Sequence, residues 1–181
     1  MKDNLRNRLL KLLATVSPPE LGPGPRPGVR SLQELEAELD SILRDAGISE
    51  SSCELIRGLV LLWHDHLDAS HTISQSIENS DGSFLHAIMH RREPDYWNSK
   101  YWWRRVGKHP CFTQLGKRAA ALLDSRHEQE LRAKLVPRGE WDACAFVDVC
   151  EATAADKTST RIELLRELQR LETEVLLDHF L

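Results

Sequence analysis

The chain has 181 residues, of which 41% are hydrophobic and 29% charged, and its formal net charge at pH 7 is −4. This length and composition are those of an ordinary globular domain that can bury an apolar core. The acidic balance gives no reason to expect nucleic-acid binding, which needs an excess of basic residues. We therefore expect one domain without a nucleic-acid partner.

The four cysteines are widely spaced and form no CxxC pair. This spacing argues against a zinc finger or a disulfide framework and predicts reduced thiols in a cytoplasmic protein. No apolar stretch approaches the roughly 20 residues that span a bilayer, so we expect no membrane association.

The first 29 residues divide into two segments. Residues 1–16 are interpreted as an amphipathic docking helix, with helical periodicity over 4–15, rather than as a cleaved targeting peptide. Residues 17–29 hold five of the eight prolines and three glycines. Proline fixes its own φ and disfavours helix in the residue before it, so this segment is predicted to be an extended, dispensable connector. Residues 30–181 are then expected to form a single domain.

Helical periodicity dominates these remaining residues. Ser31 and Glu34 form a capping box for a helix that ends before Gly47, and one long helix is predicted over 51–77. Further helices are predicted over 83–93, 98–106, 112–124, 126–135 and 140–153, with a last one that starts at Thr158 or Ser159. No strand alternation and no solenoid repeat is found. The predicted fold is an all-α, single-domain bundle of about seven to eight helices.

One stripe of the predicted 51–77 helix carries chemically useful polar groups. At 100° per residue, Arg57, His64, Asp68, His71 and Gln75 fall within about 60° of one another. A polar helix face usually meets water, and this alternative stays open. The preceding sequence LIRGLVLLW is apolar nearly all round, and the stripe lacks the Lys and Glu of solvated faces. Both observations favour a stripe that faces inward.

The next predicted helix repeats this spacing with His86, His90 and Glu93. An H-x3-H pair projects both imidazoles from one helix face, which is a geometry that zinc accepts. Facing the first stripe, the pair would complete a bundle-core site for zinc, iron or manganese. The Glu-x-x-His and HExxH motifs are absent, so a metal-free polar site and structural histidines remain alternatives.

A basic-aromatic stretch follows over residues 91–109, with six Lys or Arg and two carboxylates. Arginine forks suit carboxylate or phosphate groups, and arginine over an aromatic ring gains cation–π attraction. We expect these cations to cover one side of the site and to bind a small anionic ligand there. Alternatively, they form internal bridges to residues 31–81, which carry eleven Asp or Glu and two Arg.

The candidate site residues fall into three sets, and some belong to two of them. The candidate catalytic residues are Asp68, His71 and His90. The candidate ligand-binding residues are Arg57, Gln75, Arg91, Arg92, Lys100, Arg104 and Arg105. The candidate metal ligands are His64, Asp68, His71, His86, His90 and Glu93. Among the other reactive residues, Cys111 is interpreted as a buried thiol, and His127 and His179 as surface histidines.

The runs WHDHLDASHTISQ and GSFLHAIMHRREPDYWNSKYWWRRVGKHP resemble an uncharacterised family of soluble bacterial and fungal proteins. The resemblance covers roughly residues 60–110, under a third of the chain. It implies no activity, and no residue role is carried over from it.

Three functions are consistent with these patterns. The first is a small-molecule enzyme, because histidine supplies general acid-base groups near neutral pH or metal ligands. The second is a non-catalytic module that binds an anion in the same pocket. The third is a structural or interaction protein whose terminal amphipathic helices bind a partner chain or a second copy. P-loop, Rossmann and nucleophile-elbow motifs are absent.

Overall fold

The structure, a computed structural model, describes residues 2–44, 46–156 and 160–181. Within these ranges it contains α-helices and one 3-10 turn but no strand, which confirms the all-α prediction. The described helices number ten, more than the seven to eight expected. They are α1 (Lys2–Leu12), α2 (Leu32–Leu43), α3 (Glu50–Trp63), α4 (Leu67–Ser76), α5 (Ser80–Arg92), α6 (Tyr96–Val106), α7 (Cys111–Ser125), α8 (Gln129–Leu135), α9 (Ala143–Ala155) and α10 (Ile162–Phe180), with the 3-10 turn at Pro137–Gly139. The predicted start of the last helix at Thr158 or Ser159 lies outside the described residues.

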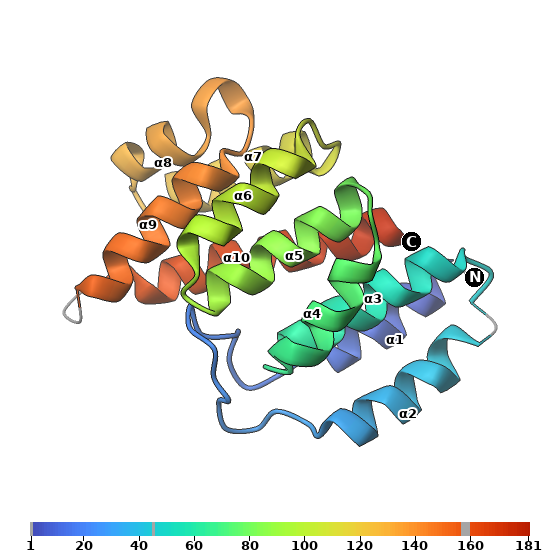
Figure 1. Cartoon of the computed structure of the whole chain (residues 1–181). Helices are drawn as coiled ribbons and strands as arrows, with labels where there is room; N and C mark the ends of the chain where they lie inside the picture. The colour runs from blue at the N-terminus through green and yellow to red at the C-terminus, as the bar shows by residue number, and fades with distance from the viewer. Residues whose placement is uncertain (1, 45, 157–159) are drawn as a thin grey trace.

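Helix α5 lies at the centre of the bundle, between α4 and α6 (Figure 1). It also contacts α3, where a Cβ on Gly58 would come within 2.7 Å of Leu85. All eleven residues from Gly82 to Arg92 are buried, so α5 presents almost no face to solvent. Its polar side chains must therefore find partners inside the protein.

The predicted 51–77 helix is wrong, because the chain breaks between α3 and α4 at residues 64–66. Asp65 adopts φ +68°, in the left-handed region where helices often end. The Asp65 N–H bonds the Leu62 carbonyl at 3.2 Å, and the His66 N–H bonds the Leu61 carbonyl at 3.0 Å. These two bonds are those of a Schellman motif, which usually has glycine where Asp65 stands.

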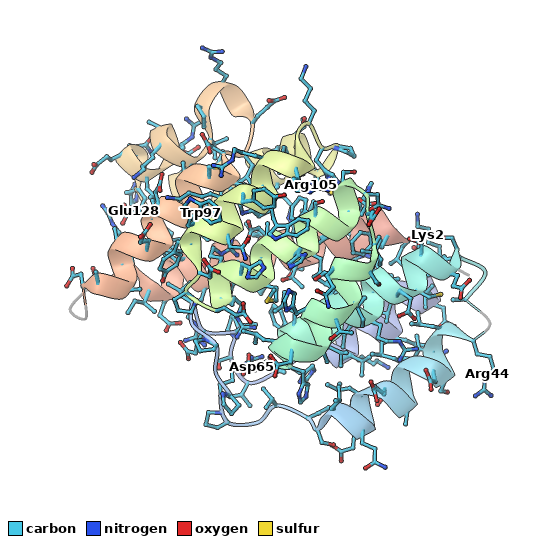
Figure 2. The ribbon with its side chains drawn as sticks, in the orientation of Figure 1. Lys2, Arg44, Asp65, Trp97, Arg105 and Glu128 are labelled. Carbon is cyan, nitrogen blue, oxygen red and sulfur yellow. The ribbon has the colours of Figure 1, made fainter. Side chains whose placement is uncertain are left out.

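A buried ionic node holds Asp65 in this conformation. Its carboxylate accepts hydrogen bonds from Arg26 Nη1 at 2.5 Å and from Arg92 Nη2 at 2.7 Å. The two guanidinium groups also donate to the carbonyl groups at the end of α3, Arg26 to Trp63 and Arg92 to Leu62. The node thus pairs the Asp65 carboxylate with two guanidinium groups and also satisfies carbonyl groups at the end of α3. Figure 2 shows Asp65 beside the N-terminal segment that supplies Arg26.

The segment 17–29 is extended and closely attached to the bundle. Its carbonyl groups at Pro18, Pro19, Glu20 and Gly22 accept hydrogen bonds from Arg92, Arg166 and Gln169. Before this segment, α1 buries Leu5, Leu9 and Leu12 in the common core, and Arg6 pairs with Asp178 of α10 at 2.6 Å. These contacts argue against the prediction that residues 1–29 can be removed without unfolding the domain.

We expect Arg26→Gln to lower the free energy of unfolding by about 1–3 kcal/mol, because it removes buried hydrogen bonds to the Asp65 carboxylate and the Trp63 carbonyl, while Arg92 still balances the carboxylate charge. Urea unfolding followed by circular dichroism measures this change. The matched control is Arg30→Gln, which removes the same charge from a half-exposed pair with Glu38 and should cost about 0–1 kcal/mol. Equal losses in the two variants would contradict a central role of the node.

Candidate metal centre

Three of the predicted metal ligands come together on α4 and α5. His71 projects from α4, and His86 and His90 project from α5 one turn apart. One ligand nitrogen from each ring lies within 4.8 Å of the other two. The ring centroids of His71 lie 4.7 Å from His86 and 5.1 Å from His90. We call these residues the histidine cluster.

His86 is the most unusual member of the histidine cluster. It is 2% exposed, and neither of its ring nitrogens has a hydrogen-bond partner among the described residues. The ring stacks on Trp102 at 3.9 Å between centroids and on His90 at 4.7 Å. Buried polar groups in proteins are nearly always paired, since an unpaired one loses its hydration without compensation. A bound ion or ligand would supply the missing partner.

His90 is oriented by two neighbouring side chains. Its Nδ1 lies 3.0 Å from a carboxylate oxygen of Glu93, and its Nε2 lies 3.1 Å from the side-chain nitrogen of Asn98. The carboxylate accepts a hydrogen bond when Nδ1 carries the proton, and the Nε2 lone pair then accepts from the Asn98 amide, which a metal ion would have to displace. A carboxylate behind a histidine is the usual support of a histidine that binds metal.

The cluster favours neutral imidazoles. Burial, together with the neighbouring His90 and His71, lowers the pKa of His86 to about 3. Burial also lowers the pKa of His90, against the opposing effect of Glu93. Neutral imidazole is the form that binds a metal ion, so protons compete little for the His86 and His90 nitrogens at neutral pH.

An acidic recess of about 580 Å³ lies beside the cluster. It is lined by Pro23, Gly24, Pro25, Asp65, Leu67, Asp68, Glu93 and Asp95. Glu93 joins the recess to His90, and Asp68 lies one helical turn before His71. Because the node neutralises only Asp65 among these carboxylates, the recess attracts cations and repels anions.

The other residues of the predicted polar stripe lie elsewhere. The break at Asp65 separates His64 from the cluster, and its ring bonds the Leu12 carbonyl at 2.8 Å and the Arg30 N–H at 3.2 Å. Arg57 pairs with Asp40 and Glu54. Gln75 is exposed on α4. His64 and Arg57 therefore have structural partners of their own, away from the cluster.

Besides Arg57, three of the predicted anion-binding cations form internal bridges. The fully buried Arg91 pairs with Glu172 at 2.5 Å and lies over the Phe146 ring at 4.5 Å. Arg92 belongs to the ionic node, and Lys100 pairs with two acidic residues of α9, Asp148 and Glu151. For these residues the internal-bridge alternative accounts for the observed contacts.

Arg104 and Arg105 differ from those three cations. Both are exposed, and neither has an ion pair within the described ranges. The Arg105 guanidinium lies 5.2 Å above the Trp102 ring, which in turn covers His86. Figure 2 shows Arg105 near the end of α6 opposite Trp97.

A second group of possible ligands was missed by the sequence analysis. His109 and His179 both approach one oxygen of Asp81, at 2.9 and 2.8 Å, and Cys111 lies beside them. The Cys111 N–H bonds Nδ1 of His109 at 3.2 Å, so the His109 proton sits on Nε2 and points to Asp81. Burial raises the pKa of the Cys111 thiol to about 12.

This second group already has its hydrogen-bond partners, so it does not require a metal ion. Its members come from the start of α5, the connection from α6 into the first residue of α7, and the end of α10. No spacing in the sequence indicates that these segments meet.

Comparison with known proteins gives no match to a family model, to a curated protein or to a solved structure. Within the described ranges, no helix has the length and apolar character needed to cross a membrane. The resemblance of residues 60–110 to an uncharacterised family therefore stays a prediction.

We expect the metal-free protein to lose stability as the pH falls from 6.5 toward 3. In this range His86 is protonated in the unfolded chain, whereas its lowered pKa keeps it neutral in the folded protein. Each unit of difference in pKa contributes up to about 1.4 kcal/mol. Urea unfolding at several pH values, with a chelator present, measures the slope. His86→Phe keeps an aromatic ring against Trp102 and should flatten it. An unchanged slope in this variant would contradict a buried, neutral His86.

Proposed function

We propose that the protein binds one divalent transition-metal ion through His71, His86 and His90. The observation that carries this proposal is the buried His86 ring, whose two nitrogens have no partner in the described part of the chain. Two nitrogens on one tetrahedral zinc ion lie about 3.3 Å apart. The cluster nitrogens lie within 4.8 Å of one another, so an ion would draw them closer by up to about 1.5 Å and turn the stacked rings of His86 and His90 toward it.

Zinc fits this ligand set best among the three candidate ions. Imidazole nitrogen suits zinc, whereas manganese prefers oxygen ligands and non-haem iron sites usually include a carboxylate. Glu93 is engaged as the partner of His90 Nδ1, and Asp68 is exposed in the recess. Three histidines supply three of the four positions of a tetrahedral zinc site.

We favour an enzymatic role because three histidines would leave the fourth coordination position of the zinc ion open. Zinc sites with three protein ligands usually hold a water molecule or a substrate in the fourth position, and the ion lowers the pKa of that water to about 7. Asp68, one turn from His71 in the acidic recess, is the candidate for accepting a proton there. His71 and His90 act in this proposal as ligands rather than as acid-base groups.

The proposed anionic ligand has less support at this site than the metal ion. Arg91, Arg92 and Lys100 are held in internal pairs, and the recess beside the cluster is acidic. Arg105 does not contact His86 directly: its guanidinium lies over Trp102, and Trp102 stacks on His86. The charge distribution favours entry of a cation into the recess.

A structural role is the second candidate function, and the stacking of His86 on Trp102 favours it. An imidazole within an aromatic stack can fill space in a core without a metal ion. The interaction role expected for the terminal helices has less support, because α1 and α10 bury their apolar faces in the same core.

Metal binding is tested on the purified protein by metal analysis and by zinc titration calorimetry. We expect close to one equivalent of zinc per chain in the wild type. His71→Gln and His90→Gln should each weaken zinc binding by at least about tenfold, because each removes one imidazole ligand. The control is His127→Asn, which changes a histidine at φ +58° outside the cluster and should leave zinc binding intact.

His86→Phe separates the two candidate functions. Under the metal proposal, it abolishes zinc binding while the protein stays folded. If the wild-type protein binds no zinc, iron or manganese above the level of His86→Phe, the metal proposal is wrong and the structural role stands.

A further inference from the structure

A second, independent feature is an exposed aromatic surface on α6. The exposed large apolar or aromatic side chains among the described residues are Val16, Trp97 and Tyr101, and the last two lie one turn apart on α6. Trp97 is 74% exposed and Tyr101 is 38% exposed. Their rings are nearly parallel, at 13°, with centroids 6.3 Å apart. Adjacent exposed aromatic rings form a contiguous apolar area, which is typical of an interaction surface.

Two cations share this side of the helix. At 100° per residue, Trp97, Tyr101, Arg104 and Arg105 fall within about 100° of one another, away from the side that is buried against the bundle. Both arginines are exposed, and the Arg105 guanidinium lies 6.0 Å from the centroid of the Tyr101 ring. We call these four residues the α6 face, and Figure 2 shows Trp97 and Arg105 near its two ends. Trp, Tyr and Arg are the residue types enriched at the energetic centres of protein–protein interfaces.

The charge reverses along the α6 face. Glu93 and Asp95, just before its start, are exposed and line the acidic recess. Arg104 and Arg105 lie at its end, and Lys108 follows as a third exposed cation. A partner with uniform negative charge, such as a nucleic acid or an anionic membrane, would be attracted at the basic end and repelled at the acidic end. A second copy of the same surface, turned antiparallel, matches the charge at both ends.

We propose that two copies of the chain associate through the α6 face in an antiparallel, two-fold symmetric contact. With Tyr101 on the two-fold axis, the four-residue spacing sets Trp97 of each copy against Arg105 of the other. The arginine then lies between Trp102 of its own chain and Trp97 of the second copy, so it gains a second cation–π contact. Asp95 of each copy lies beside the basic end of the other. Each favourable contact occurs twice, as in any two-fold interface.

The small size of this contact predicts a weak dimer. Helix α6 has 11 residues and is therefore about 16 Å long. Two helices of this length that cross along one face bury less than the roughly 1,200–2,000 Å² of a stable interface. We therefore expect an equilibrium between monomer and dimer rather than a permanent dimer. The histidine cluster contributes no residue to the contact, so the inference does not depend on the metal proposal.

The test is sedimentation equilibrium of the full chain between about 10 μM and about 1 mM, a range that covers weak association. The buffer contains a chelator, so that zinc cannot bridge two chains. We expect the average mass to rise from the 20.7 kDa of one chain toward twice this value as the concentration rises. Added salt should lower the dimer fraction, because it screens exposed charges.

Two variants and a matched control locate the contact. Trp97→Ala should weaken dimerisation by at least about tenfold, as expected for a central aromatic residue of an interface. Arg105→Gln should weaken it in the same direction, because it removes the cation that faces Trp97 of the second copy. Arg8→Gln removes the same charge from an exposed residue of α1 and should leave dimerisation unchanged. Circular dichroism should show the wild-type helix content in all three variants.

Charge reversal tests the antiparallel direction. One variant combines Arg104→Glu with Arg105→Glu, and the other is Asp95→Lys. Each should fail to dimerise alone, whereas an equal mixture should associate, because the reversed ends of one chain then match those of the other. Asp95 also caps α6 through the Asn98 N–H. Asp95→Asn keeps this cap, removes the charge and should weaken dimerisation in a folded protein.

Three results would overturn the inference. The first is a chain that stays monomeric up to about 1 mM, which would leave the α6 face solvated or reserved for a different partner. The second is a dimer that survives Trp97→Ala, which would place the contact on another surface. The third is a mixture of the charge-reversal variants that associates no better than either variant alone, which would exclude the antiparallel pairing.

Discussion

The buried node of Asp65 with Arg26 and Arg92 is the interaction on which the rest of the structure depends. It holds Asp65, between α3 and α4, in the left-handed backbone conformation, and this conformation sets the direction of α4 relative to α3. It also ties the N-terminal segment to the centre of the bundle. Breaking a buried ion pair leaves an uncompensated charge, which is costly, so these features are expected to form and fail together.

The direction of α4 decides which histidines meet. On one continuous helix, His64 and His71 would share a face, as the sequence pattern predicts. With the break at Asp65, His64 closes the end of α3 against the Leu12 carbonyl, and His71 alone faces α5. The histidine cluster is therefore a consequence of the node as much as of the histidine spacing.

Burial of α5 on all sides explains why His86 stands out. The other large polar side chains of this helix each have an acidic partner, Glu172 for Arg91, Asp65 for Arg92 and Glu93 for His90, although Nε of Arg91 is unpaired among the described residues. The same environment that pairs these groups leaves both nitrogens of His86 without one. A buried ring with both nitrogens unpaired is unusual, and it is the observation on which the proposed metal site rests.

The sequence by itself determined the helical class, one helix start and the pairing of two of the three cluster histidines. Apolar periodicity gave the all-α class, the capping box of Ser31 and Glu34 opens α2 as predicted, and the H-x3-H spacing places His86 and His90 together. These features depend on neighbours within a turn or two of helix. Only the tertiary structure decided the break at Asp65, because its partner Arg26 lies 39 residues away, and the burial of Arg91, whose partner Glu172 lies 81 residues away. Such pairs depend on which helices pack together, and helical periodicity carries no information about partners at that distance.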